Sequence, residues 1–189
     1  MKRTLASSQN GLKLICSLLF FLLPFATTIQ IQAQANKANS FPRDSIIAAA
    51  REIIGNLKYC AIITLDSTGT TSVRTMNPFP PEEDMSVWMA TNTRSRKIDE
   101  IKKNPNVTLY YANHAAVDGY VAIKGKAVLV TDPVEIQKRK REYWKQAFPD
   151  FKYLVLIKVV PERLEVINYK HKMYNSEPTW LAPYIEFNK

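Results

Sequence analysis

The sequence has few of the residues that build metal, thiol or nucleotide sites. It contains five glycines, two cysteines and two histidines among 189 residues. Without a glycine-rich phosphate loop, a dinucleotide-binding fold is not expected. His114 and His171 lie far apart, with no Glu-x-x-His or Cys-x-x-Cys spacing, so no metal site is predicted. Because a nucleophile-elbow motif is also missing, a Ser-His-Asp hydrolase is not indicated.

A cationic and then apolar segment opens the chain. Three cations accompany an apolar run at 14–26, which is too short for a spanning helix of about 20 residues, and Ala33-Gln34-Ala35 follows with a small-x-small cleavage pattern. Residues 1–35 are therefore predicted to be a secretory signal peptide, cleaved at Ala33 or Ala35. The protein is expected to be periplasmic or secreted, with no stable membrane anchor after cleavage.

The mature chain is expected to be one moderately basic domain. The leader holds three cations, so its removal lowers the net charge from +9 to +6 and leaves 154 residues, enough for a single core. That charge suits anionic small ligands, and export argues against a nucleic-acid partner. Only Cys60 remains, so no intrachain disulfide can form. Its place in an apolar strand pattern predicts a buried, unreactive thiol.

The apolar patterns predict a mainly β fold with flanking helices. After a polar linker at 36–43, helical spacing predicts a helix over 44–56. Gly125 is expected to mark a bend or bulge, and Pro161-Glu162-Arg163 is expected to be a turn. Consecutive strands with tight turns favour an antiparallel sheet that closes on itself. The predicted strands are 59–65, 71–76, the stretch from Val87, 107–112, 119–130, 153–160 and 164–169.

Three of these strands, 59–65, 107–112 and 153–160, are apolar on both faces. Helices should cover one side, and the barrel interior or a partner subunit the other. A further helix is predicted from Asp132-Pro133, with proline at its first position. It would carry the basic run 138–141, which is interpreted as a solvated helix face and not as a nucleic-acid patch.

The stretch 87–97 is the candidate for the chemistry of the protein. Its apolar beginning predicts a strand, its polar middle a turn, and the spacing of Ile98 and Ile101 a helix. The first amides of a helix have no intrahelical partner, and they favour anions such as phosphate. Several side chains with a hydroxyl group or a positive charge lie in this stretch, next to the predicted start of the helix. The alternative interpretation is a capped, solvated helix start with surface charge.

Three segments resemble the FMN-binding split-barrel proteins related to pyridoxamine 5'-phosphate oxidase, especially their general-stress-protein branch. They are Ser72-Val-Arg-Thr-Met76, the stretch from Thr91 to Lys97 with Asn104-Pro105-Asn-Val107, and Gly119-Tyr-Val-Ala-Ile-Lys-Gly125. The resemblance covers roughly residues 44–170 and implies a six-stranded antiparallel split β-barrel that dimerises, with FMN at the dimer interface. The tail, 171–189, would pack on the domain or on the dimer partner.

The resemblance also implies which residues hold the cofactor. Arg74, Arg96 and Lys97, helped by Ser95, would bind the FMN phosphate. The remaining implied contacts are backbone around Thr75 and Met76 at the flavin ring, Thr91 and Asn92 along the ribityl chain or ring, and Tyr120, where the oxidase has a flavin-contacting glutamine. Arginine suits this task because its fork of donors matches phosphate oxygens.

Two functions follow from the resemblance. The first is an exported FMN-dependent oxidoreductase, in which the flavin carries the redox chemistry and the protein binds and orients it. The second is a non-enzymatic binding or carrier protein for a flavin or for haem. His114 or His171 could ligate haem, and the alternative interpretation of each is an exposed loop histidine. The residues name neither a catalytic side chain nor a substrate.

Overall fold

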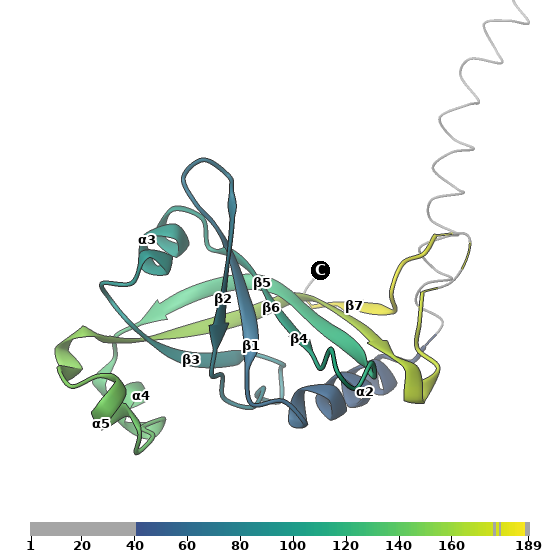
Figure 1. Cartoon of the computed structure of the whole chain (residues 1–189), viewed down its shortest axis with the longest axis horizontal. Helices are drawn as coiled ribbons and strands as arrows, with labels where there is room; N and C mark the ends of the chain where they lie inside the picture. The colour runs from purple at the N-terminus through teal and green to yellow at the C-terminus, as the bar shows by residue number, and fades with distance from the viewer. Residues whose placement is uncertain (1–40, 176, 178, 188–189) are drawn as a thin grey trace, which may run out of the picture.

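The computed structural model describes residues 41–175, 177 and 179–187. The predicted signal peptide and most of the predicted linker lie outside the described residues. Figure 1 shows a curled sheet with a helix below it and smaller helices at one end. The elements in chain order are α2 Arg43–Gly55, β1 Cys60–Leu65, β2 Thr71–Met76, β3 Val87–Asn92, α3 Arg96–Lys103, β4 Asn106–Ala112, β5 Gly119–Val130, α4 Pro133–Lys138, α5 Trp144–Ala147, η1 Phe151–Tyr153, β6 Leu154–Asn168, η2 Tyr169–His171 and β7 Tyr184–Glu186.

The strands form one antiparallel sheet in the order β2-β1-β4-β5-β6-β3, and short β7 pairs with β6 outside this path. The six strands curl into a half-barrel whose two end strands, β2 and β3, are not neighbours in the ladder. The predicted mainly β, six-stranded antiparallel split barrel with flanking helices is thereby confirmed.

The predicted turn at 161–163 is wrong, because β6 runs without interruption from Leu154 to Asn168. Lys124 pairs with Arg163 and Gly125 with Pro161, so Glu162 is the extra residue of a bulge. At a bulge the ladder is locally broken, and a proline without an amide hydrogen is tolerated there. The bulge expected at Gly125 is confirmed, and it is what lets Pro161 stay inside the strand.

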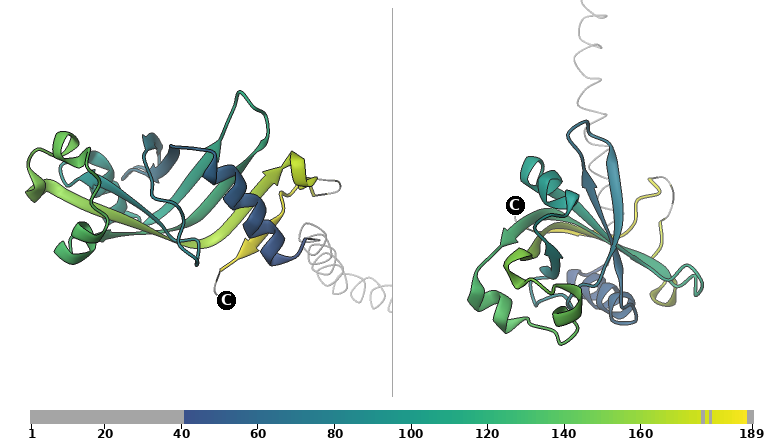
Figure 2. Two further views of the ribbon diagram at one scale, coloured as in Figure 1. Left: turned by 90° about the horizontal axis from the view of Figure 1, so that it is seen from below. Right: turned by 60° about the vertical axis from the view of Figure 1, so that its left-hand side comes forward.

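The main core lies between the inner face of the sheet and α2. This helix packs against β4, β5, β6 and β7, and it lies across the sheet when the molecule is seen from below (Figure 2, left). Its buried residues recur at helical spacing, at Ile46, Ala49, Ala50, Ile53 and Ile54. The alternation of β1 sends Cys60, Ile62 and Thr64 inward. Thr64 is thus a polar residue on the core face.

A second, smaller core explains why 153–160 is apolar on both faces. Leu154 and Leu156 pack with Trp88 and Trp144, while Ile157 belongs to the main core. The cover comes from the segment after β5, which contains α4 and α5 and lies at the lower left of Figure 1. Helices were predicted to cover one side of this strand, and the barrel interior or a partner subunit the other; the structure places α4 and α5 near one side and the main core on the other.

The prediction that the basic run 138–141 lies on a helix face is wrong, because α4 ends at Lys138 and α5 begins only at Trp144. Lys138 and Lys140 are exposed, whereas Arg139 and Arg141 are half-buried. The Arg139 guanidinium lies 3.7 Å from the ring centre of Trp88. The two arginines differ from the lysines because their planar heads can stack on aromatic rings as well as bind acceptors.

We expect Arg139→Ala to destabilise the fold by about 1–2 kcal/mol, through loss of a partly desolvated stacking contact and an ion pair. The Arg139 Nη2–Glu82 Oε1 distance is 2.7 Å, and the Arg139 side chain is 11% exposed. Lys138→Ala is the matched control and should change stability by less than about 0.5 kcal/mol. Urea unfolding of both variants is the measurement. Equal effects would show that the arginine contacts contribute nothing.

The loop between β2 and β3 folds back along β3. The Phe79 amide donates to the Trp88 carbonyl at 2.7 Å, and the Glu82 amide donates to the Ser86 carbonyl at 2.9 Å. Arg51 of α2 holds the same loop by donating to the carbonyl of Glu82 at 2.6 Å. The loop contains three prolines, Pro78, Pro80 and Pro81. The outer edge of β3 is therefore lined at its start, at Trp88, by a fixed segment of its own chain.

Cys60 is buried, as predicted, with 4% of its surface exposed. Burial raises the pKa of its thiol to about 12, so the reactive thiolate is rare near neutral pH. We expect iodoacetamide at pH 8 to leave Cys60 unmodified in the folded protein and to modify it fully in urea. Mass spectrometry of the peptide that contains Cys60 measures this. Rapid modification without urea would contradict it.

Among the described residues, no helix is both long enough and apolar enough to span a membrane.

Candidate functional site

The stretch 87–97 folds as strand, turn and helix start, as predicted. β3 ends at Asn92, and α3 begins at Arg96 after the N-cap residue Ser95. The Asn92 side chain shapes the turn by accepting from the Arg94 amide at 2.8 Å. The Ser95 hydroxyl makes no capping hydrogen bond to the helix. The Ile98 amide donates to the Ser95 carbonyl at 2.9 Å, so the amides of Arg96 and Lys97 are the ones that keep donors for another acceptor.

Arg74 reaches this helix from β2. It is directly opposite Ile62 on β1, so its side chain lies on the inner face of the sheet. Its Nη1 donates to the Thr64 hydroxyl at 2.7 Å, and its Nη2 donates to both carboxylate oxygens of Glu100, at 2.7 and 2.8 Å. Arg74 and α3 are thus joined through one buried carboxylate.

Glu100 is the centre of the cluster, although it is not among the residues predicted to bind the cofactor. Its side chain is 4% exposed, and it also accepts from Thr64 Oγ1 at 2.5 Å and from Arg96 Nε at 3.1 Å. Burial alone would raise the pKa of its carboxyl. The hydrogen bonds from Thr64 and Arg74 and the nearby arginine charges outweigh burial and hold the pKa below its usual range.

Two signals in the sequence point to Glu100. Arg96 and Glu100 are four residues apart on one helix, the spacing of an ion pair. Thr64 is a polar residue in an otherwise apolar inward row of β1. Neither signal alone distinguishes a buried carboxylate from a solvated one. Ion pairs four residues apart are common on exposed helices, and a single threonine in an apolar row does not name its partner.

Lys97 is the most buried cation of the group. It is 9% exposed, and its Nζ donates to Thr91 Oγ1 at 3.0 Å and to Ser95 Oγ at 2.5 Å. Burial and then the charge of Arg74 lower the pKa of its ammonium, while Glu100 acts in the opposite direction. A desolvated ammonium beside two hydroxyls is arranged to bind a further anionic oxygen.

Arg96 differs from the other two cations because it faces solvent. Its side chain is 77% exposed, and its Nε contacts Glu100. Glu100 is thus bound by Nε of this guanidinium and not by its two terminal nitrogens. The hydrogen-bonded cluster itself contains three cations and one carboxylate, which leaves two net positive charges; the carboxylates of Asp66 and Asp99 lie outside it. This charge and these donors fit a phosphate monoester, which carries about two negative charges.

The sequence profile of the family described as pyridoxamine 5'-phosphate oxidase like matches residues 46–175. The chain belongs to this family. The match spans every residue of the cluster and all of the sheet except β7. No curated protein matches the chain.

Solved structures of other proteins share the split-barrel fold. General Stress Protein 26 from Bacillus anthracis str. Sterne is 21% identical, with 74% of this chain and 97% of that chain covered and a TM-score of 0.59. A pyridoxamine 5'-phosphate oxidase-related, FMN binding protein from Nostoc punctiforme PCC 73102 is 15% identical, with 78% and 97% covered and a TM-score of 0.52.

A heme binding protein from Mycobacterium smegmatis is also similar to this chain, at 13% identity and a TM-score of 0.54, with 67% of this chain and 55% of that chain covered. At such identities the likeness extends to the fold alone. The split-barrel fold thus occurs in a protein that binds FMN and in a protein that binds haem.

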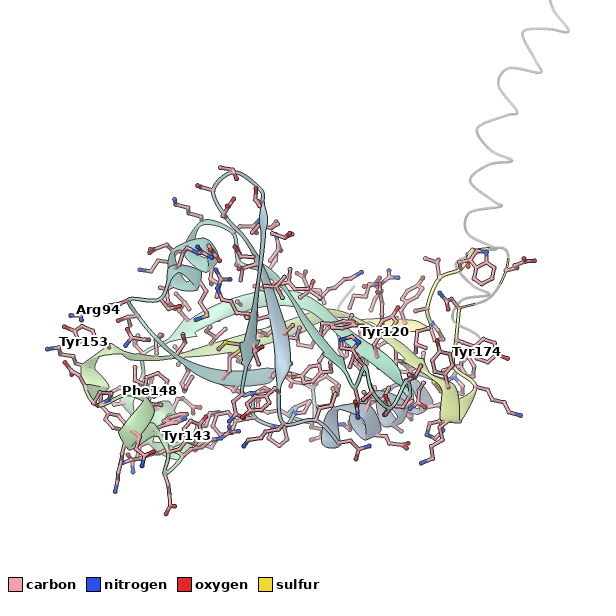
Figure 3. All side chains as sticks on the ribbon, in the orientation of Figure 1. Arg94, Tyr120, Tyr143, Phe148, Tyr153 and Tyr174 are labelled. Atoms are coloured by element: carbon pink, nitrogen blue, oxygen red, sulfur yellow. The ribbon has the colours of Figure 1, made fainter. Side chains whose placement is uncertain are left out.

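In this member of the pyridoxamine 5'-phosphate oxidase like family, the structure brings together five of the nine predicted cofactor residues: Arg74, Thr91, Ser95, Arg96 and Lys97. Asn92 is next to them at the end of β3. Thr75 is exposed on β2 and Met76 is buried in the core. Tyr120 is set apart, packed 5.6 Å from the ring of Tyr110 on the half of the sheet away from α3 (Figure 3).

The two histidines do not join this cluster. His114 stacks on Tyr110, with ring centres 6.3 Å apart, and His171 Nε2 lies 2.6 Å from Glu52 Oε2. Within the described ranges, no group of three or more His, Cys, Asp and Glu side chains is placed to hold a metal ion.

Proposed function

We propose that the chain is an FMN-binding flavoprotein that uses the flavin for oxidation and reduction. The observation that supports it is the cluster of Arg74, Arg96 and Lys97 at the α3 N-terminus, with two net positive charges after Glu100 is counted. FMN differs from riboflavin by the phosphate that this cluster fits. When bound, FMN supplies the redox chemistry.

The residues of the chain bind and orient the cofactor. The exposed fork of Arg96 and the ammonium of Lys97 would hold phosphate oxygens. The hydroxyl of Ser95 and the free amides of α3 would complete the set of donors. Thr91 and Asn92, which precede this point on β3, would lie along the ribityl chain, and the backbone at Thr75 and Met76 would border the ring.

Haem is the competing ligand, and the histidines argue against it. An axial ligand needs a free imidazole nitrogen next to an open apolar surface. His171 is joined to Glu52 on the surface, and His114 lies on a loop that stacks against Tyr110. Neither is near the cation cluster, whereas FMN uses that cluster directly. FMN is therefore the better match to the residues present.

We propose that the protein works as a homodimer and is exported through residues 1–35. The outer face of β1, β2 and β4 supports the dimer. It carries Ala61, Ile63 and Tyr110, which are only half-buried, and Val73, which is 63% exposed. Such a face suits burial against a second copy, and Tyr120 would then reach the cofactor from the partner. Light scattering of the cofactor-loaded protein tests the homodimer, and a monomer mass at micromolar concentration would contradict it.

The experiment for the proposed function is a visible spectrum of protein that lacks residues 1–35, purified from its native compartment. Flavin bands near ~450 nm that bleach with an electron donor and recover in air are expected. Acid release followed by chromatography would identify FMN by its phosphate. A Soret band instead of flavin bands would overturn the proposal in favour of haem carriage. Bands that do not bleach would refute the redox role.

A further inference from the structure

One buried carboxylate lies at the centre of the cations. Glu100 takes contacts on both oxygens, from Thr64, Arg74 and Arg96, at 2.5 to 3.1 Å. Thr64 accepts from Arg74 while it donates to Glu100, so three side chains from β1, β2 and α3 close a ring. A buried carboxylate is stable only when it is paired in this manner.

The two arginines of the cluster differ in which nitrogens they use to bind Glu100. Arg74 directs Nη1 and Nη2 inward, to Thr64 and Glu100, and its side chain is 19% exposed. Arg96 is bound to Glu100 through Nε, while its side chain stays 77% exposed. Glu100 thus holds Arg96 by the nitrogen nearest its stem and leaves the terminal nitrogens for a ligand.

We propose that Glu100 is a positioning residue for the phosphate of FMN, an inference that rests on the proposed function. Glu100 fixes Arg74 and Arg96 before the ligand arrives, so less side-chain freedom is lost on binding. It also lowers the repulsion among three cations that lie together without a ligand. The carboxylate therefore aids anion binding, although its own charge has the same sign as the ligand.

The test compares Glu100→Gln with Asp99→Asn in fluorescence titrations with FMN and with riboflavin. Asp99 is the exposed neighbour on the same helix, so both variants remove one negative charge, and only Glu100→Gln releases the arginines. We expect Glu100→Gln to weaken FMN binding about tenfold or more and riboflavin less than about twofold. Asp99→Asn should change each affinity by less than about twofold.

Each outcome decides the proposal. FMN binding that stays equal or tightens in Glu100→Gln would overturn it, as would equal loss of FMN and riboflavin by a protein that is still folded by circular dichroism. If wild-type protein binds riboflavin as tightly as FMN, the proposed function fails and not the role of Glu100 alone.

A second variant covers the case in which Glu100→Gln does not fold. Thr64→Val keeps both charges and removes only the hydroxyl that bridges them. It should weaken FMN about threefold, without effect on riboflavin, because one hydrogen-bonded link of the ring is lost. An unchanged preference for FMN in Thr64→Val would then overturn the positioning role.

Discussion

Arg96→Ala is expected to weaken FMN binding about ten- to a hundredfold and to leave riboflavin binding nearly unchanged. The reason is the position of the guanidinium at the start of α3, 77% exposed and anchored at Nε by Glu100. A hydrogen bond to a charged group contributes roughly 1.5–3 kcal/mol, and only FMN carries the charged group. Fluorescence titration of the apo-protein with each ligand measures the two affinities.

Arg94→Ala is the matched control, because it removes the same side chain two residues earlier. The Arg94 guanidinium lies 3.6 Å from the ring centre of Tyr153 and donates to its hydroxyl. Figure 3 shows the two side chains together at the end of the sheet. We expect a change of less than about threefold for FMN. If Arg96→Ala weakened the binding of FMN and of riboflavin equally, Arg96 would not be a ligand of the FMN phosphate.

Gly125→Ala is expected to destabilise the fold by about 3 kcal/mol or more, because the added methyl group overlaps the backbone of the neighbouring strand. A Cβ atom at Gly125 would lie 2.0 Å from the Val160 carbonyl oxygen and 2.9 Å from its carbon. Both are backbone atoms of β6, so no side-chain rotation relieves the overlap. The bulge would have to open, and with it the pairing of β5 with β6.

Gly55→Ala adds the same methyl group where there is space. No atom lies within 4 Å of a Cβ built at Gly55, the last residue of α2. It should leave stability unchanged or raise it by about 0.4–1 kcal/mol, because alanine restricts the unfolded chain. Urea unfolding at fixed pH measures both variants. Similar stabilities for the two would show that β5 and β6 separate easily at the bulge.

The order of helices and strands was predictable because each follows from local apolar spacing. The strand, turn and helix of 87–103 depend on residues close in sequence, and so does the helix of 43–55. Pro161 misled the prediction because its effect depends on Gly125 across the sheet. A proline ends an isolated strand, but it is accommodated where the partner strand has a bulge.

The cations of the site were predictable, and their arrangement was not. Arg74, Arg96 and Lys97 were found through the resemblance to a family, which names positions without giving contacts. Glu100 was missed because burial of a helical carboxylate depends on what β1 and β2 place against it. The same limit applies to Arg139, whose stacking on Trp88 depends on the path of the chain after α4.

The loop that lines β3 has a consequence for self-association. β3 is a terminal strand of the sheet, and it ends next to the cation cluster. An open terminal strand can recruit another chain through its unpaired amides and carbonyls. Here part of that ladder is already used by the amides of Phe79 and Glu82, and Pro78, Pro80 and Pro81 have no amide hydrogen to extend it. Growth by strand addition is therefore hindered at the start of β3, which is the end of the strand away from the cation cluster.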